Sequence, residues 1–449
     1  MSQIANRTAA PAKATMSDAQ TSIRYWTVVA THVVIDIYPI IFSALMHVLR
    51  ADLGLTKSQV AVVYALTPLF SGPPQIFFAW LGDKFDTRAF GPIGLIVGGV
   101  CISSIGFAQD FWQLIALEVI GVMGVGAYHP IAVSLAGELG GRAIRHGRTL
   151  AVSIFFTAGM LGHSVGPFVA SRMNRAFGIE SLVWLVVPAV LATIALVVMT
   201  SGVGHRDANH RETHASLSKA QRGRRWFAVG LLSVQNMLRF CAQISLIVIA
   251  NFWAGSVIAE NPDRAAVLGS NIIMWLTIGM GVSSLIAGRI IRTGHEKWPL
   301  VVITIVGGVV VAGTGYVGRE FGLWAILTAS CLGAVGFASV IPTCIATAQR
   351  LLPSHTGLVS SLMMGFGWGF SSLAAWVVPA LFVNTSLEEV HTVPPAQVDA
   401  GYIWIAGLIL LSGLLCLALP DDLLKESARE SGVEGEPEHV ENLSEAPEP

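Results

Sequence analysis

The sequence predicts an all-α integral membrane protein with twelve transmembrane helices, arranged as two pseudo-symmetric six-helix halves. Three observations support this class. Hydrophobic residues make up 53% of the 449 residues and charged residues 12%, against roughly 25% charged residues in soluble domains. Twelve apolar segments have about the 20 residues that one membrane crossing needs. A long polar interruption at residues 202–225 separates six of these segments from the other six.

The segments define the expected boundaries of every element. The predicted spans lie near residues 23–48, 60–81, 90–108, 111–136, 149–171 and 180–201, and near 226–254, 265–288, 298–317, 320–349, 357–383 and 400–419. The corresponding divisions are a disordered N-terminal tail (1–20), a first half (21–201), a linker (202–225), a second half (226–420) and an acidic disordered tail (421–449).

The basic residues predict the orientation. Of the 27 Lys and Arg residues, 20 fall in segments on the side of the two termini, six fall on the opposite side, and Arg239 lies within span seven. Cytoplasmic segments carry the excess of positive charge. We therefore expect both termini to be cytoplasmic, in a multi-pass protein of the cell inner membrane. No secretory signal is expected before Thr21, because the preceding residues lack a short apolar core.

The two halves have similar sequences in their fourth and tenth spans. Gly124–Leu139 reads GVGAYHPIAVSLAGEL and Gly336–Leu351 reads GFASVIPTCIATAQRL. An offset of 212 residues aligns Gly124 with Gly336, Pro130 with Pro342 and Ala136 with Ala348. Internal repeats of this kind are typical of transporters whose site lies between the halves.

Several function classes are disfavoured. A net charge of −1 leaves no basic surface for nucleic acid. The five cysteines have no CxxC spacing, so we expect neither a metal site nor a disulfide framework. There is no GxxxxGK[ST] loop, HExxH motif or nucleophile triad. We therefore expect a protein that is not an enzyme and has no cofactor.

Span one contains two ionisable residues, His32 and Asp36, at a spacing of one helical turn. A charge at the centre of a bilayer costs about 2.5–3.5 kcal/mol even on the mildest scale. Residues four apart share a helix face. The pair is thus a candidate proton-coupling site, and the alternative is a structural hydrogen-bonded pair.

Arg239 in span seven is predicted to lie at a depth similar to that of Asp36. Because arginine stays charged, we expect it either to pair with Asp36 or to bind a carboxylate or phosphonate of the substrate. A fixed tether between helices is the alternative. Gln235, Asn236 and Gln243 are candidates for neutral hydrogen bonds to substrate, or equally for polar packing between helices.

Glu118 and His129 in span four are eleven residues apart, about three helical turns, and are expected to share a face. Together with Asp36 they would supply titratable groups at several depths. His129 precedes Pro130, so it is equally able to cap a kinked helix.

The segment Ala79–Arg88, AWLGDKFDTR, resembles the signature loop of the major facilitator superfamily. Asp83, Lys84 and Arg88 occupy the charged positions of the motif, whereas Asp86 stands where a glycine is usual. The resemblance implies the twelve-helix fold of that superfamily. It also implies that these charges form a cytoplasmic gate latch, with simple orientation charges as the alternative.

The chain is most similar to the fosmidomycin-resistance branch of drug-efflux proteins. The similarity includes His32-x-x-x-Asp36-x-Tyr38, Tyr128-His129-Pro130, Arg239 and Ala348–Gly365. It implies that Tyr38 and Arg239 contact substrate. The glutamate that usually follows the histidine-proline pair is Ile131 here, and Glu118 is a candidate to replace it.

Span five contains Gly162-x-x-x-Gly166-Pro167, which resembles the glycine-proline motif of exporters in the superfamily. Small residues at this spacing allow close helix contact, and proline bends the helix. We expect these residues to take part in gating, and the motif favours export over uptake.

These features predict a proton-coupled secondary transporter that exports a small anionic drug or metabolite by alternating access. Its expected partners are the substrate, protons and the lipid bilayer, and the expected state is a monomer. A proton-coupled importer of an organic anion is the first alternative. A membrane sensor or assembly protein without transport activity is the second, for which the linker and the acidic tail leave room.

Overall fold

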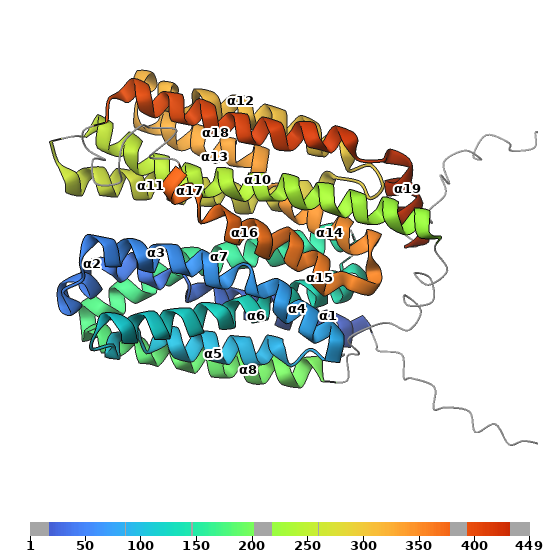
Figure 1. The fold of residues 1–449 in the computed structure, drawn as a ribbon, viewed down its shortest axis with the longest axis horizontal. Helices are drawn as coiled ribbons and strands as arrows, with labels where there is room; N and C mark the ends of the chain where they lie inside the picture. Colours follow the sequence, from blue (N-terminus) through green and yellow to red (C-terminus); the bar gives the residue numbers. More distant parts are fainter. Residues whose placement is uncertain are drawn as a thin grey trace, which may run out of the picture.

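The computed structural model describes residues 18–85, 87–144, 147–201, 218–258, 260–377 and 393–431. Within these ranges the protein is entirely helical (Figure 1). The helices of the first half are α1 (Asp18–Ile37), α2 (Ile41–Leu53), α3 (Lys57–Ser71), α4 (Pro74–Phe85), α5 (Phe90–Ser103), α6 (Phe111–Ala143), α7 (Gly147–Phe177) and α8 (Val186–Thr200), with 3-10 turns at Ile105–Phe107 and Ile179–Leu185.

The second half contains α10 (Lys219–Val257), α11 (Pro262–Ile290), α12 (Lys297–Phe321), α13 (Leu323–Ala338), α14 (Ile341–Leu351), α15 (Thr356–Ser361), α16 (Gly367–Ser371), α17 (Ala374–Val377) and α18 (Pro395–Leu415), followed by α19 (Asp421–Glu430). A π-helical turn, Leu362–Phe366, joins α15 to α16. Residues 1–17 of the predicted N-terminal tail lie outside the described residues, and its last three residues, 18–20, belong to α1. Residues 202–217 of the predicted linker also lie outside the described residues.

Ten helical segments in the described ranges are long and apolar enough to cross a membrane. The two other predicted spans are interrupted helices. Span one is divided into α1 and α2 because Pro39 cannot continue a helix. The described part of span eleven, up to Val377, consists of α15, the π-helical turn, α16 and α17. Interrupted helices in membrane proteins often border a binding site.

Local capping explains where several helices begin. The side chain of Asp110 accepts a hydrogen bond from the backbone of Gln113 at the start of α6. Thr56 and Ser218 form capping boxes at the starts of α3 and α10. Each cap satisfies backbone N–H groups that have no partner within the helix. Helix α10 therefore begins at Lys219, so the last seven residues of the predicted linker are helical.

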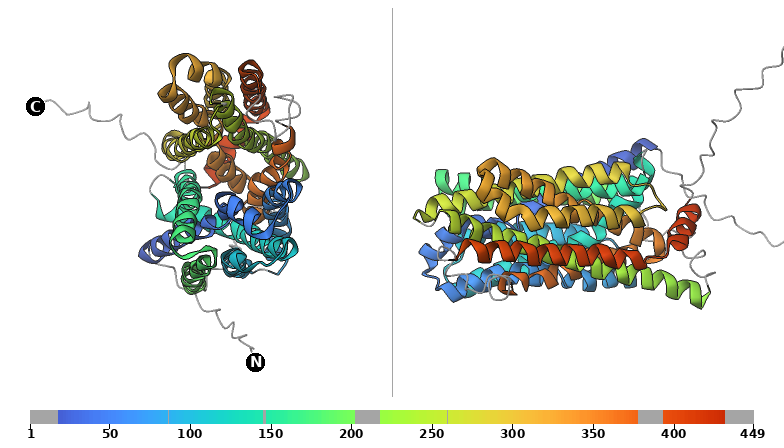
Figure 2. Two further views of the ribbon diagram at one scale, coloured as in Figure 1. Left: turned by 90° about the vertical axis from the view of Figure 1, so that its left-hand side faces the viewer. Right: turned by 90° about the horizontal axis from the view of Figure 1, so that it is seen from above.

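The two halves lie side by side with parallel long axes (Figures 1 and 2). They are closest near the end of the bundle that carries α19, called here the α19 end, and they diverge toward the other end. Near the α19 end, Gln349 of α14 donates to the backbone oxygen of Val133 in α6 at 3.1 Å. The hydroxyl oxygens of Ser134 in α6 and Thr356 in α15 are 2.7 Å apart. These contacts hold the halves together at one end of the molecule.

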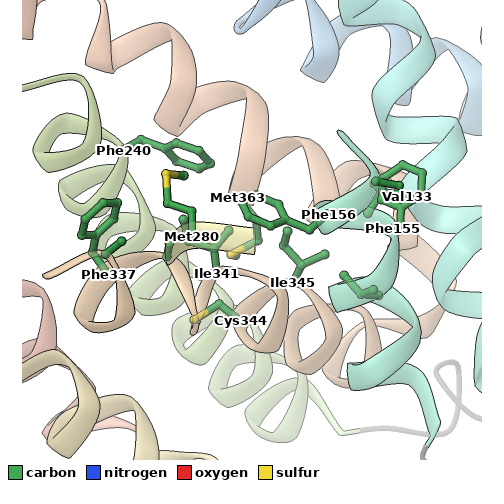
Figure 3. Packing of buried hydrophobic residues seen from close by; sticks show 14 of the residues in the cluster. Val133, Phe155, Phe156, Phe240, Met280, Phe337, Ile341, Cys344, Ile345 and Met363 are labelled. Carbon is green, nitrogen blue, oxygen red and sulfur yellow. The ribbon is translucent and has the colours of Figure 1, made fainter. Parts of the chain in front are cut away.

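Apolar side chains fill the region between the halves (Figure 3). Phe156 of α7 and Val133 of α6 come from the first half. The second half contributes Phe240, Met280, Phe337, Ile341, Ile345 and Met363. Aromatic and aliphatic side chains from both halves thus belong to one buried cluster.

The internal repeat is visible in the helix starts and in two ion pairs. Helix α6 begins at residue 111 and α13 at residue 323, a difference of 323 − 111 = 212. The same offset aligns Glu138 with Arg350. Arg88 donates to Glu138 at 2.7 Å, whereas Arg350 donates to Glu296 at 2.6 Å. Each half thus has an ion pair at this position of the repeat, and the charge at the aligned residue is exchanged from Glu138 to Arg350.

Helix α19 corrects the prediction that the whole segment after residue 420 is disordered. Leu423, Leu424 and Ala428 are buried on one face of α19. Arg350 donates to the hydroxyl of Ser427 at 3.0 Å, and Arg225 donates to Glu430 at 2.7 Å. The acidic composition concealed an amphipathic helix, whose apolar face packs against the bundle. Residues 432–449 of the predicted tail lie outside the described residues.

Replacing Glu296 with alanine is expected to destabilise the protein strongly. Glu296 and Arg350 are both almost fully buried, and removing one partner of a buried pair costs about 3–5 kcal/mol because the other charge stays uncompensated. Thermal melting in detergent measures the effect. The matched control is Asp422→Ala, which removes the exposed Arg224–Asp422 pair. A hydrogen bond from Arg224 lowers the pKa of Asp422, but the exposed pair should leave the melting temperature unchanged.

Candidate functional site

Asp36 lies one residue before the end of α1, next to the break that separates α1 from α2. Its side chain is only 4% exposed. A buried carboxylate needs partners that carry positive charge or donate hydrogen bonds. Within the described residues, no Lys or Arg side chain lies within 4.0 Å of Asp36, and its neighbours are histidines.

Three histidines from three helices surround the Asp36 carboxyl group. The Nε2 atom of His32 lies 3.2 Å from Oδ2, and the Nε2 atom of His129 in α6 lies 3.2 Å from Oδ1. The Nδ1 atom of His163 in α7 lies 3.4 Å from Oδ2. We call these four residues the Asp36 cluster. The structure therefore brings together the predicted residues His32, Asp36 and His129, and adds His163.

The backbone fixes the tautomers of two of these histidines. The Nδ1 atom of His32 lies 2.7 Å from the backbone oxygen of Phe155, and that of His129 lies 2.8 Å from the backbone oxygen of Val125. Carbonyl oxygens only accept hydrogen bonds, so both Nδ1 atoms carry hydrogen. In the neutral forms, both Nε2 atoms then direct lone pairs at the Asp36 carboxyl group. The cluster requires a further proton, or another cation, to hold these acceptors together.

Glycines in α7 make room for the cluster. A Cβ atom at Gly159 would lie 2.4 Å from Oδ2 of Asp36 and 2.5 Å from the His32 ring. A Cβ at Gly162 would lie 2.3 Å from the backbone oxygen of Val33, and one at Gly166 would lie 2.3 Å from that of Ile37. The predicted glycine motif, with Pro167 inside α7, thus lets α7 pack directly against α1.

The cluster is accessible mainly at His163. The His163 side chain is 24% exposed, against 2% for His32. It lies two helical turns after Phe156 and so on nearly the same face of α7. Phe156 packs in the apolar region between the halves (Figure 3). His163 therefore has the most exposed side chain of the cluster and contacts the buried carboxylate directly.

Arg239 does not pair with Asp36, which corrects one of the two predicted arrangements. Its Nε donates to Ser412 at 3.2 Å and its Nη2 donates to Thr304 at 2.9 Å. Ser412 lies in α18 and Thr304 in α12, so both partners belong to the second half. Arg239 is fully buried. The guanidinium group is directed into the second half, away from the first half, because these hydroxyl groups provide its hydrogen-bond acceptors.

The neutral polar residues of α10 are also largely engaged within the second half. Gln235 donates to the sulfur of Cys344 at 2.8 Å, and Asn236 donates to the backbone oxygen of Met363 at 3.1 Å. The Oε1 atom of Gln243 is buried without a hydrogen-bond partner in the described structure. The Oε1 atom of Gln235 and the Oδ1 atom of Asn236 are also buried without a partner in the described structure, so all three side chains keep an unused acceptor.

Tyr38 does not face the region between the halves. It is fully buried, and its hydroxyl group donates to the backbone oxygen of Leu185 at 2.7 Å. Its ring packs near Gly99 of α5. This position does not support the predicted contact between Tyr38 and substrate. The hydrogen bond instead joins the segment after α1 to Leu185 within the first half.

Glu118 is separate from the Asp36 cluster, contrary to the expectation of one shared row of titratable groups. Its Oε1 accepts a hydrogen bond of 2.6 Å from Thr67 in α3, and its Oε2 has no partner in the described structure. Side chains eleven residues apart on a helix share an approximate face, but here α3 covers the position of Glu118.

The predicted latch charges have different environments. Arg88 joins the start of α5 to Glu138 near the end of α6. Ser134 donates to Glu138 and contacts Thr356 of the second half. Lys84 lies over the Trp80 ring at 4.9 Å. Asp83 belongs to α4, and its side chain lies outside the described side chains.

Sequence reasoning missed His163 and Glu138. His163 follows Gly162 inside the motif that was recognised for packing, so its position on the same face as Gly159 and Gly166 was an available signal. Glu138 could have been found through the 212-residue repeat, which aligns it with Arg350 in the last turn of α14. The carbonyl partners of the histidines had no signal in the sequence.

Comparisons with known proteins agree with this architecture. The family model of the Major Facilitator Superfamily matches residues 29–375. The chain is 23% identical over 445 residues to the fosmidomycin resistance protein of Escherichia coli (strain K12), covering 93% of this chain and 98% of that protein. It is 30% identical over 152 residues to the 4-hydroxybenzoate transporter PcaK of Pseudomonas putida, covering 33% of this chain and 31% of that protein.

Two solved structures share the fold. The proton:xylose symporter XylE aligns with a TM-score of 0.68 at 15% identity, covering 92% of this chain and all of that chain. The human organic anion transporter MFSD10 aligns with a TM-score of 0.59 at 12% identity, covering 90% and 100%. The match over most of its length, the twelve-helix fold and the multi-pass architecture show that the chain is a membrane transporter, not an enzyme, and belongs to the Major Facilitator Superfamily.

Proposed function

We propose that this transporter is a proton-coupled exporter of a small organic anion and works by alternating access. The observation that carries the proposal is the Asp36 cluster, in which a buried carboxylate faces three imidazole nitrogens. Carboxylate and imidazole groups can exchange protons near neutral pH. Protons on this cluster would turn mutually repelling acceptors into hydrogen-bonded pairs.

The coupling step is proposed to depend on the proton occupancy of the cluster. Protonation joins the histidines and Asp36 by hydrogen bonds, and it is proposed to favour the state that faces the proton source, in which the anion is released. An antiport cycle requires that protons and substrate favour opposite-facing states. Proton binding from one side would drive release of the anion to that side, and proton release to the other side would reset the carrier.

The substrate surface is proposed to be amphipathic. The first half supplies the polar Asp36 cluster, reached through His163, and the second half supplies aromatic and aliphatic side chains such as Phe240 and Met363. An anion with an apolar body fits these two walls. The names of two relatives, a 4-hydroxybenzoate transporter and an organic anion transporter, are consistent with this class. Arg239 is proposed to stabilise the second half, because it is buried there.

The direction and topology are part of the same proposal. The excess of Lys and Arg near the α19 end supports a cytoplasmic location for that end, in a monomer of the cell inner membrane. The halves then meet on the cytoplasmic side, with Arg88, Glu138 and Gln349 in the closed gate. Such a state exposes the cluster to the outside, where an exporter takes up protons.

Membrane vesicles test the direction of transport. In inverted vesicles with an acidic lumen, an exporter should accumulate substrate above its external concentration. Fosmidomycin and 4-hydroxybenzoate, the compounds named in two relatives, are the first probes. Accumulation only in right-side-out vesicles with an acidic exterior would contradict export and support the importer. Substrate binding without flux in either preparation would support the sensor.

A further inference from the structure

We propose that the Asp36 cluster is also a binding site for a divalent transition-metal ion such as Zn²⁺. The ligand atoms are Nε2 of His32, Nε2 of His129 and a carboxylate oxygen of Asp36, which lie within 4.8 Å of one another. Two imidazoles with one carboxylate form a common ligand set for such ions. This inference goes beyond proton coupling and does not depend on the direction of transport.

The spacing of the ligand atoms fits a metal ion. Zn²⁺ binds imidazole nitrogen at about 2.0–2.1 Å, so two ligands of a tetrahedral site lie roughly 3.3–3.4 Å apart. The Nε2 atom of His32 lies 3.2 Å from Oδ2 of Asp36 and that of His129 lies 3.2 Å from Oδ1, and the three ligand atoms lie within 4.8 Å of one another. The side chains must therefore close from this spacing to about 3.3–3.4 Å for one ion to contact all three ligand atoms.

The second layer of the site is also in place. Histidines that bind metal ions usually donate their other ring N–H to a backbone carbonyl or carboxylate, which directs the remaining lone pair at the ion. His32 and His129 have this arrangement, through Phe155 and Val125 respectively. The His32 ring is also stacked on Phe155, with ring centroids 3.7 Å apart. The two nitrogen ligands are thus oriented before an ion arrives.

His163 offers an entry path and a fourth ligand. Its side chain is the most exposed of the cluster, and its Nδ1 lies 3.4 Å from the carboxylate. That nitrogen also lies 3.3 Å from the backbone oxygen of Gly159, and it must leave this contact to bind an ion. No metal-ligand spacing is visible along the chain, because the three histidines come from α1, α6 and α7, which are far apart in the sequence.

Cobalt spectroscopy on the purified, tag-free transporter in detergent tests the site. Co²⁺ should bind with one ion per chain, give visible absorption of nitrogen and oxygen ligands, and be displaced by Zn²⁺. His129→Gln and His32→Gln should each weaken Co²⁺ binding at least about 10-fold. His355→Gln is the matched control, because His355 lies beyond α14, outside the cluster, and it should bind Co²⁺ as the unmodified protein does.

Three results would overturn the metal site. These are no Co²⁺ binding by folded protein, equal binding by the His129→Gln variant when it elutes and melts like the unmodified protein, and an intense near-ultraviolet band from cysteine thiolate ligands. A separate consequence rests on the proposed function: Zn²⁺ would occupy the same lone pairs as the protons and should inhibit proton-coupled flux. If Co²⁺ binds but no flux depends on protons, the coupling proposal fails while the metal site stands.

Discussion

Replacing Asp36 with asparagine is expected to abolish gradient-driven transport, with a loss of at least about 100-fold in uphill accumulation. Asparagine keeps the shape of the side chain but cannot bind or release the coupling proton. The three surrounding histidines would also lose the negative charge that stabilises their protonated forms. Exchange of labelled for unlabelled substrate across the membrane should continue, because exchange needs no net proton movement.

The control for this variant is Asp52→Asn, which changes an exposed aspartate near the end of α2. It should keep both uphill accumulation and exchange. Measurements of both activities in the same proteoliposomes separate a coupling defect from misfolding, since a misfolded protein loses both. Full uphill accumulation by the Asp36→Asn variant would rule out a coupling role for this carboxylate.

Replacing Gly162 with alanine is expected to separate α7 from α1 and to lower both stability and transport. The new Cβ would lie 2.3 Å from the backbone oxygen of Val33, which cannot move without moving α1. Overpacking of this kind costs about 1–3 kcal/mol. Because α1 and α7 together supply three of the four residues in the Asp36 cluster, uphill transport should fall more than the melting temperature alone would predict.

The matched control is Gly407→Ala in α18, where nothing lies within 4 Å of the new Cβ. This variant gains helix propensity without a clash, so its melting temperature and transport should be unchanged or slightly raised. Gly159→Ala gives a second comparison, because its Cβ would meet the Asp36 carboxylate itself. Equal melting temperatures for the Gly162→Ala and Gly407→Ala variants would contradict the close packing of α7 on α1.

The sequence was sufficient for the class of fold and for part of the candidate site. Twelve apolar segments, the polar midpoint and the 212-residue repeat depend on composition and spacing, which a single chain displays directly. His32 and Asp36 were recognised as neighbours because four residues make one turn of a single helix. Local rules of this kind are reliable wherever both residues belong to the same helix.

Contacts between helices could not be predicted in the same way. Arg239 and Asp36 lie at similar predicted depths, but rotation of α10 about its axis directs Arg239 toward Ser412 and Thr304. That rotation depends on the packing of the whole second half. Likewise, α19 was hidden by its acidic composition, because its contacts with Arg225 and Arg350 join residues that are far apart in the sequence.

The central claim is that the Asp36 cluster carries the proton that couples transport to the gradient. The most direct test is to add substrate to proteoliposomes that contain a pH-sensitive dye and no imposed gradient. The unmodified transporter should move protons opposite to substrate as the substrate enters, and the Asp36→Asn variant should move substrate down its gradient without any pH change. Equal substrate-driven pH changes for the two proteins would contradict the account.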